Sequence, residues 1–244
     1  MCEITGICFD SRCCTPGSLF IAQRGSASDG HLFINAALES GAAAVLCEEM
    51  PSERSNGVVI KIKDTHSALG IASSNFYDRP SEKMKVVGIT GTNGKTTTTA
   101  LLGKIMSDAE DSVFVVGNIG TPYTSKALEM KDSSTTVAEI SSFQLETIEE
   151  FAPKVSAILN ITEDHLNRHH TMEEYIRVKE LIVKNQTAED YCILNYEDEV
   201  LREFGRHIVP KTVYFSSVRK LDEGIYLDGD LIVLKTADEE IPLV

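Results

Sequence analysis

Positive charge is scarce in this chain. Its 23 lysines and arginines stand against 37 aspartates and glutamates, which gives a formal net charge of -14. Such a balance repels nucleic-acid phosphates and anionic membrane surfaces unless a local basic patch overcomes the net field. The sequence contains no such patch. We therefore expect neither a nucleic acid nor a membrane among the partners of this protein.

Long apolar runs are missing as well. None approaches the roughly 20 residues of a membrane-spanning helix. Residues 1–10 also lack the basic start and the apolar stretch of a secretory signal. These absences predict a cytoplasmic protein.

The cysteines form no C-x-x-C pair, although four of the six crowd into the first fourteen residues (Cys2, Cys8, Cys13 and Cys14). Their spacing matches none of the usual zinc patterns. The alternating residues around Ile7 predict instead a strand in which small apolar thiols fill space. We expect free thiols here and no metal site.

The order of the predicted elements indicates an α/β protein with two domains. A chain of 244 residues, 42% of them hydrophobic, is long enough for two cores. Short β-rich runs alternate with helical stretches up to a polar segment around Pro80, where both periodicities stop. We place the boundary there, with a small α/β domain at residues 1–82 and a second domain at residues 83–244.

The second domain is predicted to contain a mostly parallel sheet flanked by helices. Its predicted strands are residues 85–90, 113–117, 136–140, 155–161 and 191–195. A hairpin signal at Asp228-Gly229 and a final run at residues 240–244 predict a β-rich C-terminal edge.

A glycine-rich loop follows the first strand of this sheet and precedes a helical stretch, which is the context of a phosphate-binding loop. Glycines let backbone N–H groups approach phosphate oxygens, the helix N-terminus adds partial positive charge, and a lysine adds a full one. Ile89 replaces the first glycine of the strict motif, and the alternative is a plain structural turn. We favour ATP binding, by Gly91, Thr92, Asn93, Gly94, Lys95, Thr96 and Thr97.

Polar residues follow several of the predicted strands. In an open α/β sheet, ligands lie outside the carboxyl ends of the strands. Asn118, Glu139 and His165 occupy such places and should face one crevice. Glu139 and His165 are candidate Mg²⁺ ligands, although each alone would more simply be a capping carboxylate or a turn residue. His169 and His170 are predicted to be solvent-facing turn residues.

Three segments of the second domain together resemble the central domain of the Mur ligases of peptidoglycan precursor synthesis. They are GTNGKTT at residues 91–97, EISSFQLE at 139–146 and LNITEDHLNRH at 159–169. The first domain resembles the same family through DSR at 10–12, PGSLF at 16–20, DGHLF at 29–33 and GAAAV at 41–45. The resemblance covers nearly the whole chain.

The resemblance implies roles for individual residues. It implies a catalytic set of Lys95, Asn118, His165 and Lys179. It implies Mg²⁺ held by Thr96, Glu139, His165 and a carbamylated Lys179. It implies that the uridine-linked substrate contacts Ser11, Ser26, Ala27, Ser141 and Gln144. A surface lysine on a helix is the alternative for Lys179.

The resemblance also implies a reaction. ATP phosphorylates a carboxylate of a UDP-N-acetylmuramoyl substrate, and an amino acid attacks the acyl phosphate to form an amide. Segment 117–122, GNIGTP, resembles the member that adds D-glutamate, whereas the first domain resembles the member that adds a diamino acid or lysine as the third residue. We favour D-glutamate addition by a monomer.

Two departures limit the transfer from the family. Asn167 occupies the place of a usual aspartate, and we expect the chain to lack the family's third, amino-acid-binding domain and to be incomplete for turnover. A truncated non-catalytic module that binds a UDP-sugar or a nucleotide is therefore a further alternative. A phosphate-loop kinase or GTPase lacks a supporting motif here, and folylpolyglutamate synthesis does not fit the first domain.

Overall fold

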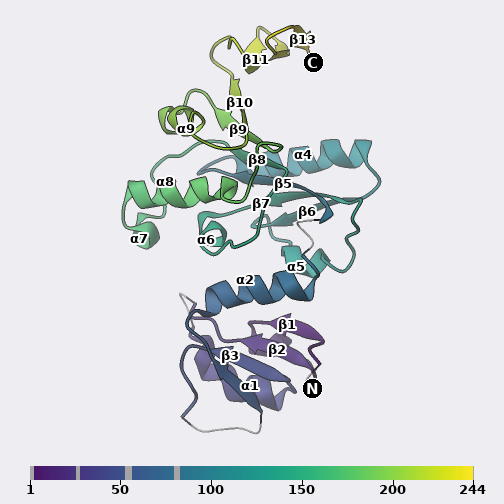
Figure 1. Cartoon of the computed structure of the whole chain (residues 1–244), viewed down its shortest axis with the longest axis vertical. Helices are drawn as coiled ribbons and strands as arrows, with labels where there is room; N and C mark the ends of the chain where they lie inside the picture. The colour runs from purple at the N-terminus through teal and green to yellow at the C-terminus, as the bar shows by residue number, and fades with distance from the viewer. Residues whose placement is uncertain (1–2, 26–27, 53–56, 80–82, 244) are drawn as a thin grey trace. The chain divides into compact units, whose positions relative to one another are not determined.

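The computed structural model describes residues 3–25, 28–52, 57–79 and 83–243. The chain divides into two compact units, residues 1–79 and 80–244, each with its own sheet (Figure 1). Among the described residues, no helix combines the length and the apolar character that crossing a membrane requires.

The first unit is built on a four-stranded parallel sheet in the order β1-β2-β3-β4. The strands are β1 (Gly6–Cys8), β2 (Ser18–Ile21), β3 (Ala44–Cys47) and β4 (Val58–Lys61). Its helical elements are η1 (Ser11–Cys13), η2 (Gly30–Phe33), α1 (Ile34–Glu39) and α2 (Thr65–Phe76). Asp10, Asp29 and Asp64 start η1, η2 and α2 because their carboxylates accept hydrogen bonds from the free N–H groups of the first turn.

The second unit contains a nine-stranded sheet in the order β13-β12-β11-β10-β9-β8-β5-β7-β6. The parallel strands are β5 (Lys85–Thr90), β6 (Val113–Gly117), β7 (Thr135–Glu139), β8 (Val155–Ile158), β9 (Tyr191–Asn195), β10 (Lys211–Ser216) and β11 (Gly224–Asp228). The antiparallel edge comprises β12 (Leu231–Lys235) and β13 (Glu240–Pro242). The α/β class, the mostly parallel sheet and the β-rich C-terminal edge are thus confirmed.

The predicted hairpin is present with a small shift of its turn. Asp228 pairs with Leu231, so Asp228 ends β11 and the two-residue loop consists of Gly229 and Asp230. Gly229 has φ +60°, the left-handed conformation that such a two-residue hairpin loop requires.

Helices cover both faces of the large sheet. They are α4 (Lys95–Ala109), α5 (Tyr123–Lys126), α6 (Ser142–Leu145), α7 (Leu166–His169), α8 (Met172–Glu180), η3 (Leu181–Val183) and α9 (Glu199–Phe204). Successive residues of a strand point to opposite faces. Accordingly, Val137 packs in the cluster beneath α4, whereas its neighbour Ala138 packs in the cluster beneath α8.

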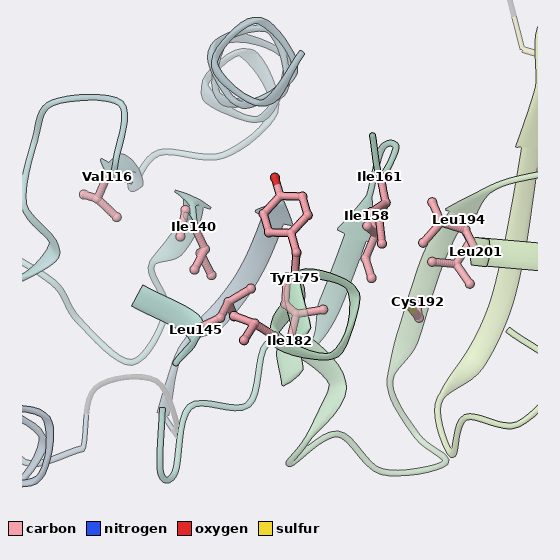
Figure 2. Packing of buried hydrophobic residues seen from close by; sticks show 12 residues of the cluster. Val116, Ile140, Leu145, Ile158, Ile161, Tyr175, Ile182, Cys192, Leu194 and Leu201 are labelled. Carbon is pink, nitrogen blue, oxygen red and sulfur yellow. The ribbon is translucent and has the colours of Figure 1, made fainter. Parts of the chain in front are cut away.

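The larger of these cores lies under α8 and α9. Figure 2 shows the phenol of Tyr175 among aliphatic side chains of this cluster, which include Leu145, Ile158 and Ile182. Tyr175 on α8 and Ile182 on η3 are both buried. This core therefore ties α6 and α8 to the carboxyl ends of β7 and β8.

Candidate active site

The loop between β5 and α4 contains two glycines with positive φ. Gly91 has φ +142° and Gly94 has φ +81°, both in the region that side chains disfavour. A Cβ atom on Gly91 would also lie 3.2 Å from the backbone nitrogen of Leu159. The 15-residue helix α4 begins at Lys95, and its first N–H groups have no partner inside the helix. The predicted segment 91–97 thus offers free donors and partial positive charge at one point.

This loop is held by the chain that follows β8. Asn160 accepts from the Asn93 backbone N–H at 2.8 Å and donates to the Asn93 carbonyl at 3.1 Å. The Thr92 hydroxyl likewise accepts from the Thr162 N–H at 3.0 Å and lies 3.1 Å from the Thr162 carbonyl. Sequence reasoning gave Asn160 no role and placed it inside the predicted strand 155–161, whereas β8 ends at Ile158. The loop and the segment 160–162 therefore form one hydrogen-bonded body.

Two lysines share the carbonyl of Gly91. Lys95 Nζ donates to it at 3.0 Å and to the Thr92 carbonyl at 2.8 Å, while Lys179 Nζ donates to it at 2.8 Å from helix α8. Lys179 is 1% exposed. Burial, and then the nearby charge of Lys95, lowers the pKa of Lys179 to about 8, and Asp164 opposes this shift. Lys179 is therefore no surface lysine. In about a tenth of the molecules its amine is neutral at physiological pH.

Glu139, Thr96 and Asn118 meet at the end of β7. The Glu139 carboxylate is 1% exposed, and it accepts from the Thr96 hydroxyl at 2.8 Å and from the Asn118 amide at 2.9 Å. The register of the sheet causes this meeting, because Gly117 lies opposite Glu139 and delivers Asn118 beside it. A Cβ on Gly117 would stand 2.1 Å from the Glu139 carbonyl oxygen, so only glycine permits this approach.

The four predicted metal ligands are only partly brought together. Thr96 and Glu139 share a hydrogen bond, but His165 lies on α7 with 46% of its side chain exposed, and Lys179 bonds to Gly91. No group of three or more histidines, cysteines or carboxylates is arranged to hold a metal ion within the described part of the chain. A hydroxyl and a carboxylate are nevertheless hard oxygen donors that suit Mg²⁺, whose other positions water and phosphate oxygens usually fill.

His165 has an unusual backbone. It starts α7 in the left-handed region, with φ +53°, and its N–H donates to Asp164 at 2.8 Å. Its ring lies 5.0 Å from that of Phe143 on α6. A left-handed non-glycine residue is held against a conformational preference, a feature that is common at functional sites.

The prediction that His169 faces solvent is wrong. His169 is 3% exposed, its Nε2 lies 2.9 Å from the Ser142 hydroxyl, and its Nδ1 lies 3.3 Å from Glu146. Burial lowers the pKa of His169, while Glu146 acts in the opposite sense. The cause is tertiary, since α6 and α7 both pack on α8 and enclose the ring between them. His170, in contrast, is exposed as predicted.

Ser141 and Gln144 form a capping box at the start of α6. The Ser141 hydroxyl accepts from the Gln144 N–H at 3.4 Å, and the Gln144 side chain accepts from the Ser141 N–H at 2.9 Å. Such reciprocal bonds satisfy the free donors of a helix start. The pair therefore has a structural role, and both residues are partly exposed beside Glu139 in the chain.

The first unit contains a pocket of about 500 Å³, which Ser11 lines together with Asp10 and Arg12. Arg12 binds Asp10 through two nitrogens, at 2.9 and 2.6 Å. The hydrogen bond from Arg12 is the main reason that the pKa of Asp10 falls to about 2. Two other predicted substrate contacts, Ser26 and Ala27, lie outside the described residues.

Comparisons with known proteins show which family and fold this chain resembles. The family pattern described as "Mur ligase middle domain" matches residues 89–237, and the one described as "Mur ligase family, catalytic domain" matches residues 3–77. A MurF ligase from Thermotoga maritima in complex with ADP has a TM-score of 0.67 at 22% identity, over 99% of this chain and 57% of its own. A UDP-N-acetylmuramoyl-L-alanyl-D-glutamate--2,6-diaminopimelate ligase has a TM-score of 0.73 at 20% identity, over 99% of this chain and 55% of its own. These two structures show a shared fold.

Relatives by sequence are closer. The UDP-N-acetylmuramoylalanine--D-glutamate ligase of Lachnoclostridium phytofermentans is 58% identical over 158 residues, which are 65% of this chain and 35% of that protein. The UDP-N-acetylmuramoyl-L-alanyl-D-glutamate--2,6-diaminopimelate ligase of Cytophaga hutchinsonii is 33% identical over 90% of this chain and 50% of that protein. The chain thus spans about a third to a half of these relatives. Because the middle-domain pattern alone matches more than half of its residues, the chain belongs to the Mur ligase family.

Proposed function

We propose that this chain is the nucleotide- and UDP-substrate-binding part of an ATP-dependent ligase that joins D-glutamate to UDP-N-acetylmuramoyl-L-alanine. The observation that carries the proposal is the 58% identity to a relative of that name, together with a loop, a carboxylate and an amide at one sheet edge. The match covers 35% of that relative, so the activity of the whole relative is carried over to this chain as a proposal.

In this proposal, residues 91–97 hold the phosphates of ATP. The α4 N-terminus directs its N–H groups toward them, and Lys95 exchanges its bonds to the carbonyls of Gly91 and Thr92 for bonds to phosphate oxygens. Thr96 and Glu139 would hold Mg²⁺, which neutralises charge on the transferring phosphoryl group when bound. Asn118 keeps the Glu139 carboxylate oriented toward that position.

The proposed chemistry forms one amide bond for each ATP. A carboxylate oxygen of the UDP-linked substrate attacks the γ-phosphorus, and ADP leaves. The amine of the amino acid then attacks the acyl carbon, phosphate leaves, and the nitrogen loses a proton. Lys95 contributes fixed positive charge where negative charge develops. Ser141 and Gln144 are proposed to face the UDP-linked substrate from the start of α6.

Carbamylation of Lys179 is part of the proposal. The neutral amine attacks CO₂, and the product is a carbamate and a proton. With a pKa of about 8, Lys179 is neutral about 300-fold more often at neutral pH than a lysine with a pKa of 10.5. A carbamate would turn a buried cation, which contacts the Gly91 carbonyl and the face of Tyr175, into an oxygen ligand suited to Mg²⁺. His165 is proposed as a further ligand.

We propose that the first domain, residues 1–82, binds the uridine end of the substrate in the pocket beside Ser11, and that residues 83–244 bind ATP. The pocket supports this assignment, since its volume suits a small polar molecule and polar groups line it. Ser26 and Ala27 remain proposed contacts of the same ligand.

One observation favours a second candidate, a ligase that adds the third residue. The diaminopimelate ligase of Cytophaga hutchinsonii matches 90% of this chain, against 65% for the first D-glutamate relative. A match of that extent must include most of the first unit. The two candidates differ in the acceptor, which carries L-alanine in one case and L-alanyl-D-glutamate in the other.

Calorimetric titration of the chain separates these candidates. With Mg²⁺ and a non-hydrolysable ATP analogue present, UDP-N-acetylmuramoyl-L-alanine and its D-glutamyl extension are titrated in turn. Tighter binding of the shorter acceptor is expected. Tighter binding of the longer one would establish the second candidate, and binding of neither would refute both. The Lys95→Ala variant should lose affinity for the ATP analogue while it keeps affinity for the acceptor.

A further inference from the structure

Two thiols face each other in the first unit. Cys8 ends β1 and is buried, and Cys14 follows η1 and is half-buried. Their sulfur atoms lie 2.7 Å apart. A disulfide bond is about 2.05 Å long, so the two sulfurs are within roughly 0.7 Å of bonding distance. The two sulfurs are therefore close enough that a small movement of the side chains brings them to bonding distance.

The chain between these thiols is the wall of the pocket. Phe9, Asp10, Ser11 and Arg12 all line it, and all four lie between Cys8 and Cys14 in sequence. The salt bridge from Arg12 to Asp10 and the cap that Asp10 provides to η1 hold this segment on the protein side. A bond between the two sulfurs would close it into a short covalent loop.

We propose that Cys8 and Cys14 form a reversible disulfide with a low-molecular-weight disulfide such as oxidised glutathione as oxidant, and that this bond tethers the substrate-pocket loop 9–13. The effect on the ligand rests on the proposed function of the pocket, whereas the bond itself does not. Such bonds in reducing compartments are typically transient and redox-sensing.

The exchange balances in two steps. The Cys14 thiolate attacks one sulfur of the oxidant, which forms a mixed disulfide and releases one small thiol. Cys8 loses its proton and attacks the Cys14 sulfur, and the second small thiol leaves. Two electrons and two protons pass from the protein thiols to the oxidant. Burial raises the pKa of both thiols, that of Cys8 to about 12, and Cys14 acts first because it is the more exposed of the two.

Cys13 offers a matched control. It is exposed and adjacent to Cys14, and so it would react with the same oxidant as a surface thiol. The described residues place no third histidine, cysteine or carboxylate beside these thiols as a metal site.

Tryptic mapping tests the bond directly. The chain is incubated with oxidised glutathione, its remaining thiols are alkylated, and it is cleaved without reduction. Cleavage after Arg12 and Arg24 places Cys2 and Cys8 in peptide 1–12 and Cys13 and Cys14 in peptide 13–24, so fragmentation of the cross-linked pair is needed to locate the bond. A Cys8–Cys14 cross-link is expected in the native chain, in Cys2→Ser and in Cys13→Ser, and it should be absent in Cys8→Ala and Cys14→Ser. A native chain without the cross-link, or Cys14→Ser with it, would overturn the proposal.

A binding measurement separates this inference from the function of the pocket. UDP-N-acetylmuramoyl-L-alanine is titrated into the oxidised and the reduced chain, and severalfold tighter binding to the oxidised form is expected because its loop is already ordered. Equal affinities would refute the tether. A cross-link without binding in either state would refute the pocket assignment alone, whereas binding without a cross-link would refute the disulfide alone.

Discussion

The buried ammonium of Lys179 should make the stability of the second unit depend on alkaline pH. Its pKa is about 8 in the folded chain and 10.5 in its ordinary state. Between these values the unfolded chain binds more protons than the folded chain, so the free energy of unfolding rises with pH. Below about pH 8, the cost of burying the charged amine of Lys179 is fully present. The whole shift corresponds to about 3 kcal/mol, to order of magnitude. About 1.4 kcal/mol of it is recovered between pH 7 and pH 9.

The Lys179→Met variant removes this titration and keeps a long unbranched side chain. Urea unfolding at both pH values, in buffer freed of CO₂, measures the difference. The native chain should gain about 1.4 kcal/mol relative to the variant between pH 7 and pH 9. At pH 7 the variant avoids the cost of the buried ammonium, about 3 kcal/mol, but it loses the hydrogen bond to Gly91, which contributes roughly 1–3 kcal/mol. On balance, the variant should be the more stable of the two.

Lys184→Met is the matched control. Lys184 also donates to a backbone carbonyl, that of Ile148 at 2.9 Å, but 39% of its side chain is exposed. Its variant should follow the pH dependence of the native chain. The reasoning about Lys179 is refuted when Lys179→Met and the native chain change in parallel. Added bicarbonate gives a second readout, because carbamate formation on folded Lys179 alone should raise Tm in the native chain and not in Lys179→Met.

Three further outcomes are expected. Gly117→Ala should destabilise the fold by more than about 2 kcal/mol in urea unfolding, because its Cβ would meet the Glu139 carbonyl. Gly120→Ala should lose only about 1 kcal/mol, since Gly120 also has a positive φ but no atom lies within 4 Å of its Cβ position. Equal losses in the two variants would contradict this reasoning. Asn118→Ala should lower stability by about 1–3 kcal/mol and weaken Mg²⁺-nucleotide affinity, measured by calorimetry; an unchanged affinity would count against the site. Because the pKa of His169 is lowered, stability should fall as pH drops below about 6.5, and a His169→Gln variant that keeps this acid loss would refute the assignment.

Much of the site could be predicted because the carboxyl ends of parallel strands lie at the same edge of a sheet. Glu139 and Asn118 follow β-branched runs, and runs that pair in parallel end at one edge. The motif at residues 91–97 also contains its own glycines and lysine, so its conformation is encoded locally. These features need no knowledge of which strands are neighbours.

Pairwise contacts across the sheet could not be predicted in the same way. Lys179 reaches Gly91 across 88 positions, and this contact depends on how α8 packs over β8. Thr96 meets Glu139 only because β7 lies between β5 and β6, an order that the sequence does not state. The sequence predicts metal ligands from their residue types. The structure shows which of these residues lie close enough together to share an ion.

His169 shows the physical reason for the one clear failure. A histidine at the end of a short helix, among polar neighbours, has the local pattern of a turn, and His170 beside it follows that pattern. The side chain of His169 is buried because Phe143 and Tyr175 flank its ring at 5.7 and 5.2 Å, and both come from other helices. Local sequence therefore sets where α7 begins and ends, while the packing of α6 against α8 sets which of its side chains are enclosed. Since α6 carries Ser141 and α7 starts at His165, a change at His169 should move the proposed substrate and metal segments together.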